Sequence, residues 1–301
     1  MIVVAGEALI DLVPQSGVGP PTPLLPARGG GPYNTAIALG RLGDRVAFCS
    51  RISTDAFGES LVERLREEGV ALQLVQRGPE PTTLAVASIG AGGSAAYTFY
   101  VEGTADRLFE LPPELPPATR ALSLGTCSLV LEPGASAYEE LMRREAGRGV
   151  FVTLDPNVRE GLIPDADAYR ARFRSWLPHV SLLKLSEDDA EWLGFDVREL
   201  AAAGPAAVVV TRGGDGLTAL TRGGDSISVP AERVEVVDTI GAGDTVNAAL
   251  LHALAERHLL SRDAVASLAP GRWREVLGLA ARAAALTCAK AGAEPPYAGE
   301  M

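Results

Sequence analysis

The chain has 301 residues, of which 47% are hydrophobic and 22% are charged, and its formal net charge is -11. An acidic surface repels phosphate backbones, so this balance argues against a nucleic-acid-binding protein. The three cysteines form no metal-ligand pattern with the three histidines, which indicates free thiols and no zinc site. Because the sequence has neither a basic leader nor a long apolar run, we expect a soluble, cytoplasmic protein without a membrane partner.

Short apolar runs alternate with longer helical patterns after a first strand at Met1–Ala5. The expected strands show little polar alternation, as is typical of parallel strands covered on both faces. They are Val46–Ser50, Ala121–Leu124, Val150–Leu154, Ser181–Lys184 and Ala206–Thr211. The expected helices are Asn34–Leu42, Phe57–Glu68, Ser136–Ala146, Ala166–Trp176 and Glu187–Leu193. This order indicates an α/β domain with a mainly parallel sheet.

Two stretches interrupt this order with pairs of apparently antiparallel strands. The pairs are Ala8–Val13 with Leu24–Arg28, and Thr83–Ile89 with Ala95–Tyr100, the second joined by a hairpin turn at Gly90–Gly93. They predict a small β lid, built from about residues 8–28 and 83–101, within a single domain spanning 1–301; the alternative is a plain extension of the main sheet. Exposed lid strands tend to associate, so a homodimer through the lid is expected.

Polar residues near the N-terminus suit a ligand with many hydroxyl groups. The two carboxylates of Glu7 and Asp11 follow the first strand closely, and the glycines of Gly29–Gly31 precede Asn34 at the start of a helix. Carboxylate, amide and exposed backbone N–H groups together offer both acceptors and donors. The alternative is that the glycines are only a turn and that Asp11 is a solvated residue at the end of a strand.

A glycine-rich loop near the C-terminus predicts a site for an anion. Val234–Val237 is predicted to be a strand, followed by Asp238 and then by Gly241, Ala242, Gly243 and Asp244 at the start of an amphipathic helix. Such a loop presents backbone N–H groups at the positive end of a helix, where a carboxylate makes sense as a base that accepts a proton from an attacking hydroxyl. The alternative is that Asp244 only stabilises the first helical turn.

Two other nucleotide-binding motifs fit this loop poorly. A dinucleotide-binding turn would need a third glycine where Val246 stands. A Walker-type loop needs Gly-Lys-Ser/Thr, and neither of the two lysines, Lys184 and Lys290, lies in that context.

The two glycine loops together resemble the paired signatures of the ribokinase-like (phosphofructokinase B type) carbohydrate kinases. The first signature is matched by Gly29-Gly-Gly-Pro-Tyr-Asn34-Thr-Ala36 and the second by Asp238-Thr-Ile-Gly-Ala-Gly-Asp244. Further matches run along nearly the whole chain, at Gly6–Asp11, Asp55–Gly58, Asp155–Arg159 and Thr211–Gly216. Within the family the chain is most similar to bacterial fructokinases, through Gly6-Glu-Ala-Leu-Ile-Asp11 and through Tyr97–Tyr100 followed by Glu102-Gly-Thr-Ala105.

The resemblance implies the ribokinase-like three-layer fold and a role for each matching residue. Asp244 would be the base that deprotonates the primary hydroxyl of the sugar, and Gly241, Ala242 and Gly243 would form an anion hole for the phosphoryl group. The residues implied in sugar binding are Asp11, Gly30, Gly31, Asn34, Tyr97, Phe99 and Arg159. Those implied in binding ATP are Lys184, Ser186, Thr211, Gly213, Gly216 and Gly243.

The resemblance also implies Mg²⁺ and a monovalent cation such as K⁺. The family's Asn-x-x-Glu segment near the divalent ion is here Ser186-Glu-Asp-Asp189, so Asp189 is the residue expected to help place Mg²⁺. Asp238 and the segment 289–292 are expected near the monovalent cation. Val101 stands where many fructokinases have an arginine after the lid strand.

The sequence thus predicts ATP-dependent phosphorylation of a sugar, with D-fructose as the leading substrate. A kinase for the acidic sugar 2-keto-3-deoxygluconate is the nearest alternative, since Arg159 or Arg28 could supply a cation for its carboxylate. A non-catalytic sugar sensor on the same fold is the alternative from another class.

Overall fold

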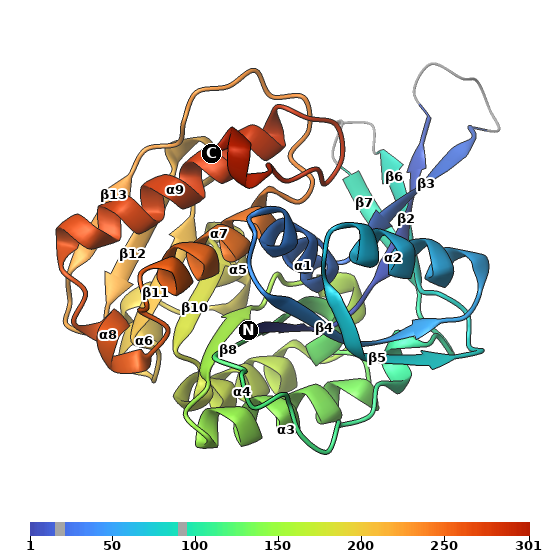
Figure 1. Ribbon diagram of the computed structural model, residues 1–301, viewed down its shortest axis with the longest axis horizontal. Coiled ribbons are helices and arrows are strands. Elements are labelled where there is room, and N and C mark those ends of the chain that lie inside the picture. The colour runs from blue at the N-terminus through green and yellow to red at the C-terminus, as the bar shows by residue number, and fades with distance from the viewer. Residues whose placement is uncertain (16–21, 90–94) are drawn as a thin grey trace.

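The computed structural model describes residues 1–15, 22–89 and 95–301, which form two sheets and the helices around them (Figure 1). The predicted hairpin turn at Gly90–Gly93 lies outside the described residues. The large sheet has nine strands in the order β13-β12-β11-β10-β9-β8-β1-β4-β5, and the small sheet has four in the order β3-β2-β6-β7.

The strands of the large sheet are β1 (Ile2–Ala5), β4 (Val46–Ser53), β5 (Ala71–Gly78), β8 (Ala121–Gly125), β9 (Phe151–Asp155), β10 (Leu182–Ser186), β11 (Ala207–Thr211), β12 (Leu217–Thr221) and β13 (Ser226–Val229). The pairs from β5 to β11 are parallel, whereas β12 and β13 pair antiparallel as a meander at one edge. The predicted mainly parallel sheet is therefore confirmed, and β5, β12 and β13 extend it beyond the strands read from the sequence.

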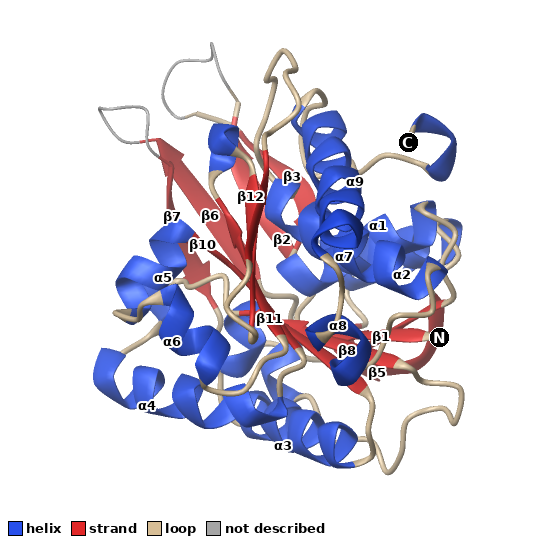
Figure 2. Ribbon diagram, turned by 90° about the vertical axis from the view of Figure 1, so that its left-hand side faces the viewer, coloured by secondary structure: helices blue, strands red, loops and turns tan. Residues whose placement is uncertain are grey.

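Helices cover both faces of the large sheet, as Figure 2 shows from its edge. One face is covered by α1 (Gly31–Arg41), α2 (Ala56–Glu67), α7 (Ala242–Glu256), α8 (Arg262–Ala266) and α9 (Pro270–Cys288). The other is covered by α3 (Gly134–Gly147), α4 (Ala166–Trp176), α5 (Glu187–Leu193) and α6 (Val197–Ala202). A separate apolar core lies between each face of the sheet and the helices that cover it. The protein therefore has the predicted three-layer α/β arrangement.

The five helices predicted from apolar spacing are all present, with ends shifted by three residues at most. Side-chain caps explain several of the starts: Asp55 accepts a hydrogen bond from the Gly58 N–H, and Asp165 accepts one from the Ala168 N–H. Ser186 and Asp189 form a reciprocal capping box at the start of α5.

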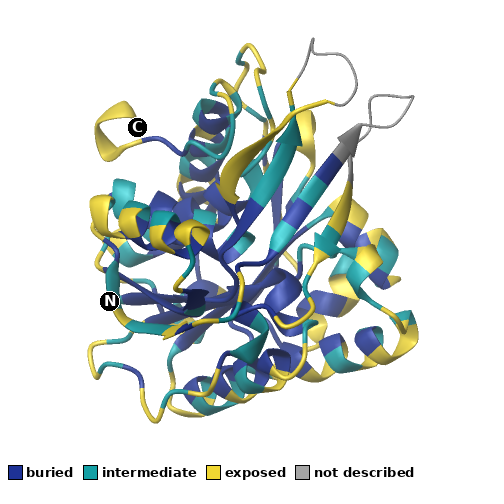
Figure 3. Ribbon diagram, turned by 90° about the vertical axis from the view of Figure 1, so that its right-hand side faces the viewer, coloured by how far each residue is buried: buried dark blue, intermediate teal, exposed yellow. Residues whose placement is uncertain are grey.

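The predicted antiparallel pairs are confirmed as the small sheet, made of β2 (Leu9–Pro14), β3 (Leu24–Gly29), β6 (Leu84–Ile89) and β7 (Ala95–Tyr100). Its two hairpins are joined by a parallel pairing of β2 with β6. The sheet stands away from the large one, and Figure 3 shows exposed residues along β3 and buried ones where β2 and β6 meet the body of the protein. It is therefore a separate layer and not an extension of the large sheet.

Candidate active site

A cavity of about 250 Å³ lies where the small sheet faces the carboxyl ends of the parallel strands. In open α/β sheets this edge is where ligands bind, because loops leaving several strands converge there. The cavity is lined by Glu7, Leu9, Asp11, Gly30, Gly31, Asn34, Tyr97, Phe99, Thr126, Cys127, Asn157, Arg159, Thr239, Ile240, Gly241, Gly243 and Asp244. All seven residues predicted to bind the sugar are among them, together with the predicted base.

Asp244 lies in the first turn of α7 with only 8% of the residue exposed. Its Oδ2 accepts a hydrogen bond of 2.8 Å from Asn34 Nδ2, although the two residues are 210 positions apart. Burial raises the pKa of Asp244 to about 6, and the Asn34 hydrogen bond and the charges of Lys184 and Arg159 oppose that rise. A carboxyl group with a pKa near 6 is ionised at neutral pH and still basic enough to accept a proton.

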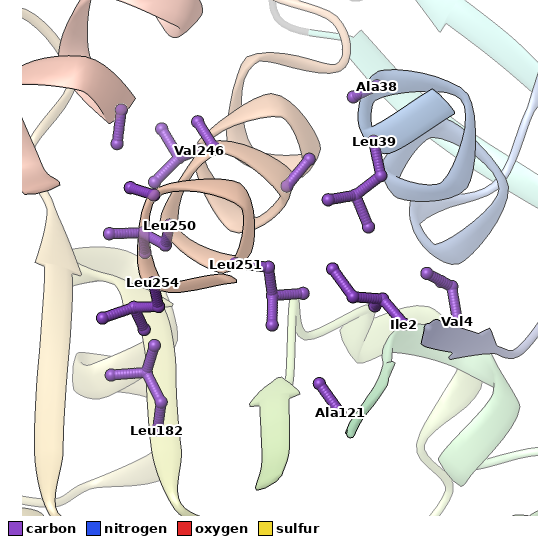
Figure 4. Close-up of a cluster of buried hydrophobic side chains, with 14 of the residues drawn as sticks. Ile2, Val4, Ala38, Leu39, Ala121, Leu182, Val246, Leu250, Leu251 and Leu254 are labelled. Carbon is purple, nitrogen blue, oxygen red and sulfur yellow. The ribbon is translucent and has the colours of Figure 1, made fainter. Parts of the chain in front are cut away.

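The helix that carries Asp244 is held firmly by its apolar side. Leu250, Leu251 and Leu254 of α7 are fully buried, and Figure 4 shows Leu251 pointing toward Ile2 of β1 in the layer between α7 and the sheet. Helix α1, which carries Asn34, packs beside α7 in the same core. The two polar side chains that meet in the cavity therefore start from helices with fixed relative positions.

The glycine loop before α7 has the conformation that its sequence predicts. Gly241 adopts φ 77°, a left-handed value that glycine reaches without steric cost, and it precedes the helix without any side-chain cap. The N–H groups of a first helical turn have no partner within the helix and point toward its positive end. The Ala242 N–H is an exception because it donates to Thr239 O at 3.2 Å.

The Val234–Val237 segment is not a strand, so that prediction is wrong. Residues 230–238 pair with no strand of either described sheet, and Val236 and Val237 are 62% and 60% exposed. The Val237 and Asp238 N–H groups instead donate to Cys288 O at the end of α9. This valine-rich segment therefore runs as a loop that is tied to the end of α9 and does not pair with the edge strand β13.

A buried ion pair lies beneath the glycine loop. Lys184 Nζ is 2.7 Å from Asp155 Oδ2, and both side chains are 5% exposed. Burial opposes the charge of the amine, but the carboxylates around it, Asp155 first, raise the pKa of Lys184 above its ordinary value. A side-chain carbon built on Gly243 would lie only 3.1 Å from Nζ, so the ammonium group supports the loop from below as a fixed positive charge.

The small sheet contributes Asp11, Tyr97 and Phe99 to the cavity. Burial raises the pKa of Asp11 to about 6, and the charge of Arg159 on the opposite wall opposes that rise. The Arg159 guanidinium donates to Asn157 Oδ1 at 2.7 Å and to two backbone carbonyls nearby. Its orientation is thus fixed by its own loop.

A second cavity, of about 310 Å³, continues from the first along α7 and α9. Thr239 and Gly243 line both cavities, so the two meet beside Asp244. The second cavity contains the predicted nucleotide-binding residues Thr211, Gly213, Gly216 and Gly243, and much of the rest of its wall is apolar, from residues such as Val234, Val236, Ala281, Ala284 and Ala285. An apolar slot that opens onto a loop of free N–H groups suits a flat base with a phosphate chain.

Four predicted residues, Lys184, Ser186, Asp189 and Asp238, line neither of these two cavities in the described part of the chain. Both oxygens of Asp189 are engaged, because Oδ2 accepts from Ser186 and Oδ1 accepts from the Val158 N–H at 2.7 Å. Asp189 therefore joins α5 to the loop after β9, and its role toward Mg²⁺ stays a prediction.

Asp238 joins the glycine loop to the segment after α9. Its Oδ1 accepts from the Ile240 N–H at 3.0 Å and its Oδ2 from the Gly292 N–H at 2.9 Å. The two segments that the sequence assigns to a monovalent cation therefore lie side by side, and binding of the cation itself stays a prediction.

Sequence reasoning gave no sugar-site role to several residues of the first cavity, above all Thr126 and Asn157, and it gave Glu7 only a general place beside Asp11. Glu7 is 2% exposed and contacts Thr126 and Ser128, which follow β8. Thr126 and Asn157 both have positive φ values, 62° and 37°. In the sequence, only the position of Glu7 between Gly6 and Asp11 indicates a role in the site. Its contacts to Thr126 and Ser128 cannot be read from the sequence, because they join residues about 120 positions apart.

Known proteins resemble this chain over nearly its full length. The model of the pfkB family of carbohydrate kinases matches residues 1–298. The fructokinase of Rhizobium leguminosarum bv. trifolii is 40% identical over 276 residues, which cover 89% of this chain and 84% of that protein. The fructokinase of Xylella fastidiosa, solved with bound ATP, has 28% identity and a TM-score of 0.87 over 100% of this chain and 94% of that one.

A further solved structure is the fructokinase of Vibrio cholerae O395 in a form with bound fructose, ADP and calcium ion. It has 26% identity and a TM-score of 0.81 over 97% of this chain and 94% of that one. These likenesses confirm the predicted ribokinase-like α/β fold.

Proposed function

The chain belongs to the pfkB family of carbohydrate kinases, and we propose that it transfers the γ-phosphoryl group of ATP to the primary hydroxyl of D-fructose, giving fructose 6-phosphate. The observation that carries this proposal is the meeting of the two cavities at Thr239 and Gly243, directly beside a buried carboxylate. An acceptor hydroxyl and the terminal phosphate of a nucleotide can approach each other only at such a junction.

Each part of the junction has a role that phosphoryl transfer requires. Asp244 accepts the proton of the sugar hydroxyl as its oxygen attacks the γ-phosphorus, and ADP leaves on the opposite side. Asn34 orients the Asp244 carboxylate through its 2.8 Å hydrogen bond. The N–H groups of the first turn of α7 and the Lys184 ammonium stabilise the negative charge on the transferred group. Asp11 accepts hydrogen bonds from sugar hydroxyls on the far wall.

The charges of the sugar cavity favour a neutral sugar over an acidic one. Three carboxyl groups, Glu7, Asp11 and Asp244, line it together with a single cation, Arg159. Three hydrogen bonds from Arg159 Nη1 to oxygens of Asn157 and Val158 hold this cation to its own loop. A sugar acid would place a fourth carboxylate among these groups, whereas fructose offers hydroxyl donors to them.

Magnesium fits this site as an ion that binds mainly to phosphates and water. The described residues contain no cluster of three or more His, Cys, Asp or Glu side chains that could hold a metal. Among the described residues, none is a hydrogen-bond partner of Asp155 Oδ1, which would hold the water shell of the ion. When bound, Mg²⁺ supplies neutralisation of the nucleotide phosphates.

We also assign the small sheet as a lid over the sugar within a single domain spanning 1–301, since Tyr97 and Phe99 reach from β7 into the cavity. Its outer residues Leu24, Leu25 and Tyr100 are 41%, 52% and 60% exposed, which supports a homodimer formed through the lid.

In the described part of the chain, no helix is long and apolar enough to cross a membrane. The three free thiols suit a cytoplasmic enzyme.

A panel of sugars in a coupled ADP-release assay tests the proposed function. D-fructose, D-glucose, D-ribose and 2-keto-3-deoxygluconate are each offered with ATP and Mg²⁺, and the product is identified by mass and by its phosphorylated position. Fructose is expected to give the highest kcat/KM. A preference for 2-keto-3-deoxygluconate would favour the acidic-sugar kinase instead, and sugar binding without ADP release from any member would favour a sensor.

A further inference from the structure

Thr126 adopts a backbone conformation that a residue of its type rarely tolerates. Its φ is 62°, and the only other non-glycine residues with positive φ in the described ranges are Asn157 and His258. Threonine is the one β-branched residue of the three, and β-branched residues are the most strongly disfavoured in the left-handed region. A strained conformation of this kind costs roughly 1–3 kcal/mol and persists only where neighbouring contacts enforce it.

Glu7 supplies those contacts from the end of the first strand. Its Oε1 accepts a hydrogen bond from the Thr126 hydroxyl, and its Oε2 accepts from both the hydroxyl and the N–H of Ser128. The Glu7 N–H donates in turn to Ser128 Oγ at 2.7 Å. A buried carboxylate with three donors around it fixes the start of the turn after β8, and with it the backbone of Thr126.

Thr126 forms part of the wall between two cavities. Gly31, Thr126 and Asp244 line both the sugar cavity and a smaller cavity of about 10 Å³ behind it, which has room for about one water molecule. The wall of the smaller cavity includes Asp155 and Asn247, whose Oδ1 atoms have no partner within the described residues and could each accept a hydrogen bond from a water molecule. A side-chain carbon on Gly31 would lie 2.6 Å from Thr126 Cγ2, so the threonine methyl fills the space beside that glycine.

We propose that Thr126, held in place by Glu7, determines the specificity of the reaction by separating the sugar cavity from the water-sized cavity behind Asp244. The inference rests on the proposed function. With the wall intact, the oxygen nearest Asp244 and the γ-phosphate is the sugar hydroxyl. With the wall displaced, a water molecule held by Asp155 and Asn247 can reach the same place.

The resulting side reaction is hydrolysis of ATP. The water oxygen bonds to the γ-phosphorus as the bond to the ADP oxygen breaks, and Asp244 accepts the proton of the water. ADP and inorganic phosphate are released without any sugar phosphate. The ratio of sugar phosphate to ADP therefore measures the separation of the two cavities, independently of the overall rate.

The matched variants are Thr126→Val and Thr126→Ser. Valine keeps the branched shape but loses the hydroxyl that Glu7 holds, so the backbone is free to leave φ 62° and the wall moves. Serine loses the methyl group but keeps the hydroxyl that Glu7 holds, so it tests whether the tether to Glu7, rather than the methyl group, keeps the wall in place. We expect Thr126→Val to raise ADP release without sugar by at least about fivefold, to raise the KM for fructose about tenfold, and to lower the ratio of sugar phosphate to ADP clearly below one. Thr126→Ser should keep that ratio near one.

The experiment measures ADP, inorganic phosphate and fructose 6-phosphate in the same reaction, with thermal unfolding as a check on folding. If Thr126→Val is unfolded, Thr126→Gly removes the wall without placing an apolar group against Glu7, and the same loss of coupling is expected. A ratio of one in every folded Thr126 variant overturns the inference. If the unmodified enzyme makes no fructose 6-phosphate, the proposed function is wrong, which is a separate result.

The role of Glu7 is tested by the double variant Glu7→Gln/Thr126→Val. If Glu7 acts by positioning Thr126, Glu7→Gln adds less than about twofold to the fructose KM once Thr126 is valine. If the fold-changes in the KM for fructose caused by the two single substitutions multiply in the double variant, Glu7 contacts the sugar independently of Thr126. That result would overturn its assignment as a positioning residue.

Discussion

The Asp244→Asn substitution removes the charge of the buried carboxylate and keeps a side chain of the same size. Burial raises the pKa of Asp244 to about 6 in the folded protein, against about 3.9 in an unfolded chain, which corresponds to roughly 3 kcal/mol at neutral pH. The folded state holds this proton more tightly than the unfolded state. The contribution of Asp244 to the free energy of unfolding therefore falls as the pH rises from about 4 to about 6. Above that range the carboxylate is ionised and the whole destabilisation of roughly 3 kcal/mol applies.

The asparagine variant does not titrate, so we expect it to be more stable than the native enzyme by roughly 3 kcal/mol at pH 7.5 and by about half of that at pH 5. Its kcat should fall by at least about 10²-fold, because no base accepts the proton of the sugar hydroxyl. Urea unfolding at both pH values, without substrates, measures the first effect, and the coupled ADP-release assay measures the second.

Asp106→Asn is the matched control, since Asp106 is a second buried carboxylate whose pKa is raised by burial, yet it lines neither large cavity. It should change stability without the loss of kcat. A near-normal kcat for Asp244→Asn would refute its assignment as the base. If Asp244→Asn and the native enzyme had equal free energies of unfolding at pH 7.5, the reasoning that the buried, ionised carboxylate lowers the stability of the fold would be refuted.

Four further outcomes are expected. The kcat should fall about tenfold between pH 7 and pH 5 as Asp244, with its pKa of about 6, becomes protonated; a flat profile measured by single turnover would contradict this. Asp11→Ala should raise the KM for fructose strongly and leave the KM for ATP nearly unchanged, whereas equal loss of both would exclude its role as a sugar ligand. Lys184→Met should destabilise the fold by roughly 3–5 kcal/mol, because it leaves Asp155 buried without its partner; the double variant Lys184→Met/Asp155→Asn should recover stability but not kcat. Leu25→Arg should convert a dimer into a monomer in light scattering, and an unchanged mass would place any interface elsewhere.

Local patterns in the sequence were sufficient for most of the fold. Alternating strands and helices gave the parallel sheet, and the four strands around residues 8–28 and 83–101 gave the small sheet with the correct pairing inside each hairpin. These features follow from side-chain period and turn chemistry, which act over a few residues. The error at Val234–Val237 arose from the same rule, because a run of β-branched residues predicts a strand whether or not a neighbouring strand is there to pair with it.

The site was predictable to the extent that its residues lie in glycine-rich segments. Asn34 and Asp244 follow glycine-rich loops, Asp11 lies in the strand segment that begins after Gly6, and the structure brings all three residues to one cavity. Thr126 and Asn157 could not be assigned in this way, and the contacts of Glu7 to the turn after β8 could not be foreseen. Their importance lies in contacts between strand ends far apart in the chain and in backbone angles, and neither property leaves a local signature.

The position of Asp244 also favours one of its two proposed roles. A carboxylate in the first turn of a helix usually accepts hydrogen bonds from the N–H groups of that turn and thereby stabilises the helix. Here α7 begins without a side-chain cap, and the carboxylate accepts its hydrogen bond from Asn34 on the neighbouring helix α1. The free N–H groups of the turn are thus left for an anion, and the carboxylate lines the cavity that is proposed to hold the sugar. A residue that only stabilised its own helix would have the opposite arrangement, which makes the base assignment the better explanation of this geometry.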